Sequence, residues 1–184
     1  MKIRNGFVSN SSSTSFTFIF KGSKLDDLYA MISKYGDHFK LSHIGWDDIP
    51  DTCNAESVIR SIRGAARSTS KYDFENISIV SIDKHISELK KQVKVNDEAI
   101  EEDEKADKGY SLTDLYSGWN AEINDKIEKL EALKKNGLTS ICQVDFGDNH
   151  GQISGMGIGT VMDYEGRHIN INAEDFAVMI DQNR

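Results

Sequence analysis

The chain has 184 residues, of which 38% are hydrophobic, and its formal net charge is -8. This length suits a single domain with a sizeable core, and the composition excludes an intrinsically disordered chain. The negative charge argues against nucleic acid and against an anionic membrane surface as partners. No apolar run has the length of a membrane span, and no apolar segment follows Lys2 and Arg4 as it would in a signal peptide. We therefore expect a cytoplasmic protein.

The first 22 residues predict a strand, a serine-rich loop and a second strand, around which the rest of the chain is expected to be organised. Phe16–Phe20 alternates large apolar with smaller residues, which is typical of a buried strand in the middle of a sheet. The polar residues before it favour turns, because short hydroxyl and amide side chains bond to the neighbouring backbone. A second interpretation makes Ser11, Ser12 and Ser13 a recognition element for a partner. No base for a serine nucleophile is identifiable beside them.

The segment Gly6–Phe16, GFVSNSSSTSF, resembles the opening of a family of uncharacterised proteins from bacteriophages and prophage-bearing bacteria, in which it typically has the form FVSNSSSSSF. Thr14 departs from the unbroken serine run of that family. The resemblance is confined to this opening. It implies a phage-related setting, and it carries no catalytic residue over to this chain.

Two helices and a strand are predicted next. The first helix runs from an N-cap at Ser23 to about Tyr35, with apolar residues at helical spacing and Gly36 at its end. The second helix is capped by Asn54 and has one apolar side. Ile77–Ile82 alternates apolar and polar residues and predicts a strand.

Arg60, Arg63 and Arg67 are spaced three and four residues apart, so they lie along one face of the second predicted helix. Such a row can bind phosphates or the acidic face of a protein partner. The more frequent case is a row of solvated arginines that contributes little. The three residues are therefore candidates for partner binding, set against ordinary solvation.

Residues 84–136 predict an antiparallel helical hairpin inserted in the domain. Two apolar seams flank a link at 101–109 that is too charged to be buried. Because this link is short, pairing of the arms within one chain is favoured over pairing into a dimer. Arms of this length reach on the order of 35 Å. Asn96 interrupts the first seam, where a polar residue either fixes the register or marks where the arms splay. The seams consist of Ile86, Leu89, Val93 and Ile100 in the first arm, and of Leu112, Leu115, Tyr116, Trp119, Ile123, Ile127, Leu130 and Leu133 in the second.

The last third of the chain predicts three strands and a helix. Thr139–Phe146 alternates as a half-buried strand does. Ile153–Tyr164 is expected to be a strand punctuated by glycines, and His168–Ile171 a short strand. Ala173–Ile180 predicts a terminal helix with Asn172 as its cap.

Asp145, Asp148 and His150 are the best candidates for chemistry, because they bring carboxylate and imidazole ligands for a divalent ion into one short segment. The segment resembles the Gly-Asp and Asn-His pieces of metallophosphoesterases. Here these pieces are fused into one turn, and the other motifs of that family are missing. Asp, Asn and Gly are also the residues that a tight turn requires, and a turn is the favoured interpretation.

Cys53 and Cys142 are the only cysteines, and their separation does not match the ligand spacing of a zinc site. We expect two buried thiols in a reducing compartment rather than a disulfide.

The sequence thus predicts one α+β domain over residues 1–184, with a mostly antiparallel sheet, packed helices and the hairpin at 84–136 projecting from it. The leading functional hypothesis is a non-enzymatic, phage-type accessory or host-modulating protein that binds another protein and needs no cofactor. The alternative is a metal-dependent hydrolase or nucleotide-processing enzyme, in which Asp145, Asp148 and His150 hold a divalent metal ion.

Overall fold

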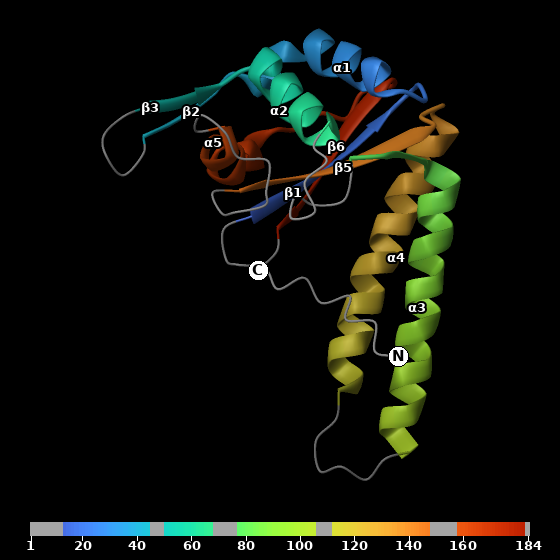
Figure 1. Cartoon of the computed structure of the whole chain (residues 1–184). Coiled ribbons are helices and arrows are strands. Elements are labelled where there is room, and N and C mark those ends of the chain that lie inside the picture. Colours follow the sequence, from blue (N-terminus) through green and yellow to red (C-terminus); the bar gives the residue numbers. More distant parts are fainter. Residues whose placement is uncertain (1–12, 45–49, 68–76, 106–111, 148–157, 183–184) are drawn as a thin grey trace.

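A computed structural model describes residues 13–44, 50–67, 77–105, 112–147 and 158–182. Its main sheet has the strand order β4-β5-β1-β6, is antiparallel throughout and carries helices on both faces (Figure 1). This confirms the predicted α+β class. The strands of this sheet are β1 (Ser13–Phe20), β4 (Ile79–Ser81), β5 (Ser140–Gly147) and β6 (Phe176–Gln182), and a second sheet pairs β2 (Leu41–Ile44) with β3 (Pro50–Cys53). The helices are α1 (Leu25–Lys34), α2 (Ala55–Arg67), α3 (Ile82–Lys105), α4 (Thr113–Lys135) and α5 (Ile158–Tyr164), with 3-10 turns η1 (Gly36–Phe39) and η2 (Gly166–His168). None of these helices is long and apolar enough to cross a membrane.

β1 lies in the interior of the sheet, as the pattern of Phe16–Phe20 predicts. It pairs with β5 on one side and with β6 on the other. Because side chains alternate across a strand, Phe16, Phe18 and Phe20 share one face while Thr17 and Ile19 share the other. All five are fully buried, so both faces of β1 are covered.

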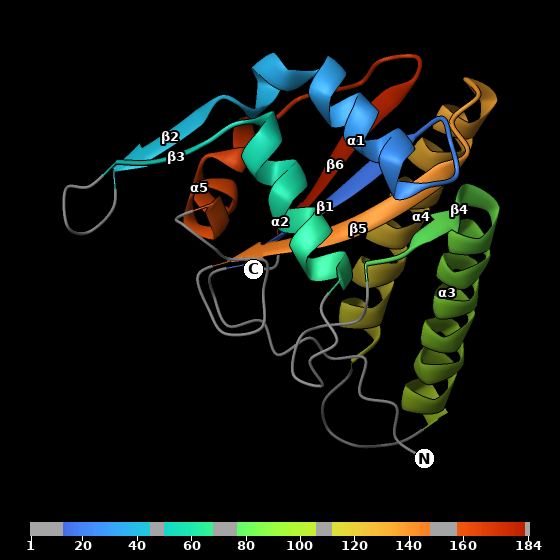
Figure 2. The same cartoon turned by 45° about the horizontal axis from the view of Figure 1, so that its top comes forward.

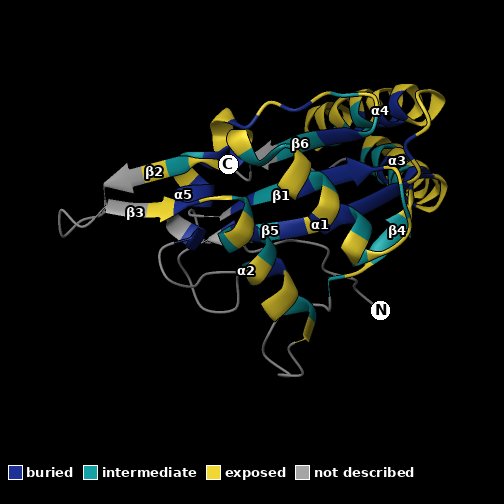
Figure 3. Ribbon diagram, turned by 90° about the horizontal axis from the view of Figure 1, so that it is seen from above, coloured by how far each residue is buried: buried dark blue, intermediate teal, exposed yellow. Residues whose placement is uncertain are grey.

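Helices α1, α2 and α5 cover the face that carries the phenylalanines (Figure 2). Figure 3 shows buried residues concentrated in the strands and exposed residues on the outward sides of these helices. The apolar residues that recur at helical spacing on each helix point to the sheet. This core includes Leu28 and Ile32 of α1, Val58 and Ile62 of α2, and Val161 and Met162 of α5, packed with Phe16, Phe18, Phe20 and Phe176.

The base of the helical hairpin covers the opposite face of the sheet. Ile19 of β1 and Ile141 of β5 pack there against side chains from both arms of the hairpin. The members from the arms are Ile82, Ile86, Ile127, Leu130 and Leu133. The hairpin is therefore anchored by a second core, and the sheet is enclosed between two apolar layers.

Helix ends follow the capping signals of the sequence closely. The Asn54 Oδ1 atom accepts a bond from the Ser57 amide at 2.9 Å, which caps α2 as predicted. α4 ends where Gly137 adopts a φ of 94°, a conformation that glycine takes without a steric cost. α1 differs from the prediction, because its N-cap is Lys24 instead of Ser23, and the Asp27 carboxylate accepts hydrogen bonds from the amides of Ser23 and Lys24. These two bonds, the one from Ser23 first, lower the pKa of Asp27.

The predictions for the last quarter of the chain are largely wrong. α5 is a helix within the predicted strand Ile153–Tyr164, because Ile158, Val161 and Met162 bury one helical side against the sheet. β6 is a strand where Ala173–Ile180 predicted a helix, and it pairs with the free edge of β1. A short apolar run carries no period that separates a strand from a helix.

The 3-10 turn η2 stands where the strand His168–Ile171 was expected to begin. The turn passes close to β1, since a Cβ at Gly166 would come within 2.6 Å of the Phe16 Cζ atom. The predicted strand Ile77–Ile82 is present but short, because α3 already begins at Ile82.

We expect Phe18→Ala to lower the free energy of unfolding by about 3–5 kcal/mol, because it removes a ring from the centre of the core. The Phe18 ring is fully buried, and its centroid lies 6.3 Å from that of Phe176 and 6.5 Å from that of Phe39. Urea denaturation measures the loss. Gln143→Ala, an exposed position on β5, is the control with a change of under about 0.5 kcal/mol. A loss below about 1 kcal/mol at Phe18 would show that β1 is not the central strand of the core.

Candidate protein-interaction site

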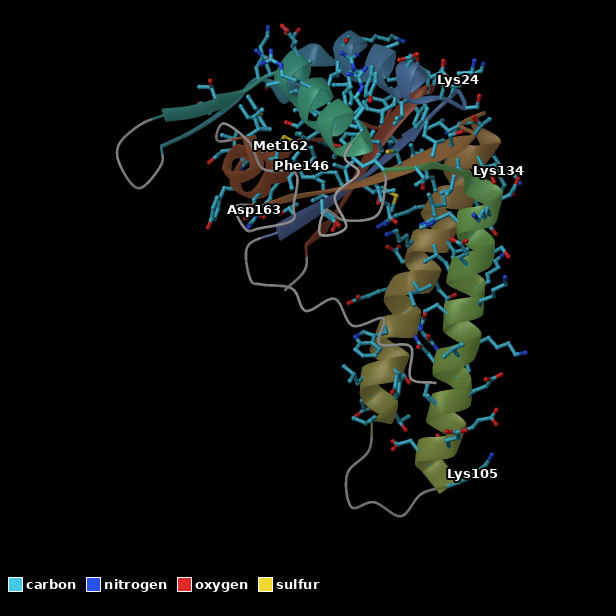
Figure 4. The ribbon with its side chains drawn as sticks, in the orientation of Figure 1. Lys24, Lys105, Lys134, Phe146, Met162 and Asp163 are labelled. Carbon is cyan, nitrogen blue, oxygen red and sulfur yellow. The ribbon has the colours of Figure 1, made fainter. Side chains whose placement is uncertain are left out.

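The hairpin predicted from the sequence is formed by α3 and α4, which run antiparallel and project beyond the sheet (Figure 1). α3 has 24 residues and α4 has 23, so the arms are roughly 35 Å long at 1.5 Å per residue. Figure 4 shows Lys134 at the end of the hairpin that joins the sheet and Lys105 at its far tip. The arms pair with each other within one chain, which was the favoured arrangement.

The register of the two arms is set by pairs along their length. Near the base, the Lys134 ammonium bonds the Asp83 carboxylate, and Lys90 bonds Glu131 at 2.9 Å. Half-way along the arms, the Asn96 Nδ2 atom donates to the Asn120 Oδ1 atom at 2.8 Å. Because the surface ion pairs contribute little, the amide pair is the stronger determinant of the register.

Asn96 and Asn120 belong to a buried polar network. Asn96 is 3% exposed and Asn120 is 9% exposed. The Gln92 amide donates to the Asn96 Oδ1 atom at 2.9 Å, and the Asn120 Nδ2 atom donates to the Asp97 Oδ1 atom at 2.7 Å. Both buried amides therefore have partners, which removes most of the penalty of burying them.

The prediction for the half of the α4 seam towards the tip is wrong, because the register of the arms places other residues inside. Trp119 is 45% exposed and Leu115 is 48% exposed, although both were expected inside the seam. Asn120 occupies the inward position instead, and Trp119, one residue earlier, is turned about 100° away from it. Nearer the sheet the prediction is confirmed, since Ile127 and Leu130 are buried.

Val95 lies on the same side of the hairpin as Trp119. Each residue directly precedes one member of the hydrogen-bonded pair Asn96–Asn120. In two antiparallel right-handed helices, the residues that precede a facing pair are turned to the same side of the hairpin. Leu115 and Leu112 precede Trp119 by four and seven residues and therefore continue that side.

We define the distal patch as Val95, Leu112, Leu115 and Trp119. Their exposed fractions are 57%, 38%, 48% and 45%. Among the described residues, the only other large apolar side chain with comparable exposure is Tyr164 on α5. Scattered apolar residues on a surface need no explanation, whereas a contiguous group on a projecting arm is typical of a protein-interaction site.

The charge of the hairpin changes along its length. The halves towards the tip, residues 96–105 and 112–122, hold eight acidic residues and one lysine. The halves towards the sheet, 82–95 and 123–135, hold five acidic residues and eight lysines. Leu112, Leu115 and Trp119 of the distal patch therefore lie in the acidic half, and Val95 lies at its border with the lysine-rich half.

The arginine row is present on the exposed side of α2, on the other face of the sheet from the hairpin base. Arg60 pairs with Glu56 at 3.2 Å, and the Arg63 guanidinium lies 4.9 Å from the centroid of the Tyr29 ring. Arg67 is the last residue of α2 and is exposed. Two of the three cations thus have partners within the chain, and partner binding by this row stays a prediction.

The serine candidates lie at or beyond the start of β1. Ser13 is the first residue of that strand and pairs with Gly147 of β5. Ser11 and Ser12 lie outside the described residues, so their proposed role in recognition stays a prediction.

Of the predicted metal ligands, only Asp145 lies within the described residues, and Asp148 and His150 lie outside them. Asp145 is on β5 and accepts a hydrogen bond from the Ser15 hydroxyl. In the described ranges there is no group of three or more His, Cys, Asp or Glu side chains that could hold a metal ion.

A buried carboxylate on α5, Asp163, lies at the same end of the sheet (Figure 4). It is 1% exposed, its Oδ1 atom accepts a bond from the Thr14 hydroxyl at 2.7 Å, and its Oδ2 atom has no hydrogen-bond partner in the described part of the chain. Thr14 and Ser15 are consecutive in β1 and point to opposite faces, so their partners Asp163 and Asp145 lie on opposite sides of the sheet. The sequence alone does not show that Asp145 and Asp163 lie on opposite sides of the sheet.

Neither cysteine is suited to nucleophilic chemistry. Cys53 and Cys142 are buried and free. Burial raises the pKa of Cys53 to about 11 and the pKa of Cys142 to about 12. Both therefore remain thiols near neutral pH, which agrees with the expected pair of buried, unlinked cysteines.

Comparison of the chain with models of protein families, with curated proteins and with solved structures finds no match in any of the three. The functional argument therefore rests on the geometry of the hairpin and on the residues themselves.

We expect Asn120→Ala to lower the free energy of unfolding by about 1–3 kcal/mol, because it leaves the buried Asn96 amide without its partner. Replacing both residues by leucine removes the polar groups together and is expected to restore the stability of the unchanged protein or to exceed it. Urea denaturation of the single and double variants forms the measurement. A double leucine variant that is less stable than Asn120→Ala would show that the amides do not act as a pair.

For the segment with Asp145, Asp148 and His150, we expect no rise in melting temperature when Mn²⁺ or Zn²⁺ is added, since the segment is predicted first as a turn. A bound ion would stabilise the native state, and acidification would weaken its binding by protonating the ligands. The measurement is a thermal melt with and without each ion, repeated on His150→Ala. A stabilisation of several degrees that His150→Ala abolishes would favour the metal-dependent hydrolase instead.

Proposed function

We propose that this protein acts without catalysis of its own, by binding another protein through the distal patch of its hairpin. The proposal rests on one observation half-way along the arms. There the usual helical pattern is inverted, with polar side chains buried between the arms and large apolar side chains exposed. At this level the seam is filled by Asn96 and Asn120, while Val95 and Trp119 face outward.

This inversion is unfavourable for the isolated chain. A tryptophan or leucine in the seam would be removed from water and would add to the stability of the hairpin, whereas the amides there bring only hydrogen bonds that largely offset the cost of burying them. Exposed large apolar side chains also increase the risk of non-specific association. The arrangement is useful when a partner covers the patch, and tryptophan is among the residues that contribute most to protein interfaces.

The setting of this function is proposed from the resemblance of Gly6–Phe16 to phage and prophage proteins. A cytoplasmic accessory or host-modulating factor is consistent with that resemblance. It also fits the anchoring of the hairpin, because the base packs on the sheet and the arms carry the patch away from it.

The test is site-specific photo-crosslinking from Val95 in phage-infected bacterial cells. We expect a protein to be crosslinked from Val95, and we expect the product to be lost in Leu115→Ser/Trp119→Ser. These exposed positions should change stability by no more than about 0.5 kcal/mol each, which circular dichroism melts verify. The matched control carries the crosslinker at Tyr164, an aromatic of similar exposure on α5. Products from Tyr164 but none from Val95 would contradict the proposed site.

A further inference from the structure

We infer that the segment bound by the distal patch is a basic amphipathic helix of the partner protein. The inference rests on the proposed function and specifies its partner. It follows from three properties of the patch: its direction, its acidic rim and the pairing of the two arms.

The patch has the shape that a helix contacts. Leu112, Leu115 and Trp119 follow one another at three and four residues and form a stripe along the axis of α4. Val95 of α3 lies on the same side, so the two arms together present a face of two adjacent helices. A third helix packs on such a face with apolar residues at i, i+3, i+4 and i+7, as in helix-in-groove recognition.

The rim of the patch is acidic towards the tip, whereas Lys91 and Lys126 lie on the same side towards the sheet. Glu98 and Glu102 follow Val95 by three and seven residues, and Glu122 follows Trp119 by three, so these side chains lie on the same side of the hairpin as the patch. All three are exposed, and Glu98 has Lys94 as an ion-pair partner at 3.8 Å. Lysine and arginine residues on the flanks of a bound helix would meet these carboxylates and would speed its association.

The same charge argues against other kinds of partner. Nucleic acid and anionic membranes would be repelled by the eight acidic residues in the distal halves of the arms. A second copy of this chain would bring two acidic tips together if the arms were parallel. Only an antiparallel offset pairing, with one tip beside the lysine-rich base of the other, would avoid this repulsion.

The experiment uses the full chain with Trp46→Phe, which leaves Trp119 as the only tryptophan. The probes are two synthetic helical peptides of about 18 residues, long enough to form some helix. Both carry leucines at i, i+3, i+4 and i+7, and one has lysines on its polar side where the other has glutamates. Titration is followed by the emission of Trp119, which shifts to shorter wavelength when the indole is covered.

We expect the lysine peptide to bind at least tenfold more tightly than the glutamate peptide, and we expect added salt to weaken its binding. The combined change Glu98→Lys/Glu102→Lys/Glu122→Lys should reverse the preference. Glu101→Lys/Glu104→Lys/Glu128→Lys is the matched control, since it alters the net charge equally at exposed positions on the opposite side of the hairpin. This control should keep the preference for the lysine peptide.

Four results would overturn the inference. One is equal binding of the two peptides, and another is binding of the lysine peptide without any shift in Trp119 emission. The third is sedimentation of the free chain as a dimer that Trp119→Ala dissociates, because a second copy would then cover the patch. If neither peptide binds while crosslinking from Val95 still captures a protein, the basic-helix inference fails and the proposed function stands. If crosslinking also fails, the proposed function fails with it.

Discussion

The pairing of β1 on both of its edges is the interaction on which the rest of this structure depends. β1 is bonded to β5 on one side and β6 on the other, so strands from the two halves of the chain are joined through it. Its two faces are also the centres of the two cores. Phe16, Phe18 and Phe20 meet α1, α2 and α5, while Ile19 meets the base of the hairpin. Loss of this strand would therefore separate every layer at once.

The two halves of the hairpin differ in the side chains that they bury. Near the sheet, Ile127, Leu130 and Leu133 are buried against Ile82 and Ile86, and this half belongs to the folding core. Further out, Asn96 and Asn120 are buried and hydrogen-bonded to each other, whereas Val95, Leu112, Leu115 and Trp119 are exposed. One half of each arm thus belongs to the core, and the other half carries the patch that we propose a partner covers.

Sequence patterns predicted the elements that have a strong period and failed where the period is short. The alternation in Phe16–Phe20 and the long apolar seams gave the central strand and the hairpin correctly. α5 and β6 were assigned wrongly, because a run such as Phe176–Ile180 has too few residues to show a helical or strand period, and its pairing with β1 is a long-range contact. The distal patch was missed for a different reason. Leu115 and Tyr116 both fit a helical stripe, and only the register between the arms decides which stripe faces inward.

The position of the hairpin between two neighbouring strands has a consequence for how such a protein can change over evolution. Ser81 of β4 and Ser140 of β5 lie opposite each other, so the chain leaves and re-enters the sheet at adjacent points. Insertion of seven residues into each arm beyond the buried base would therefore leave the sheet intact and carry the tip outward by about 10 Å. The length of the arms can therefore change while the sheet and the buried base of the hairpin stay the same.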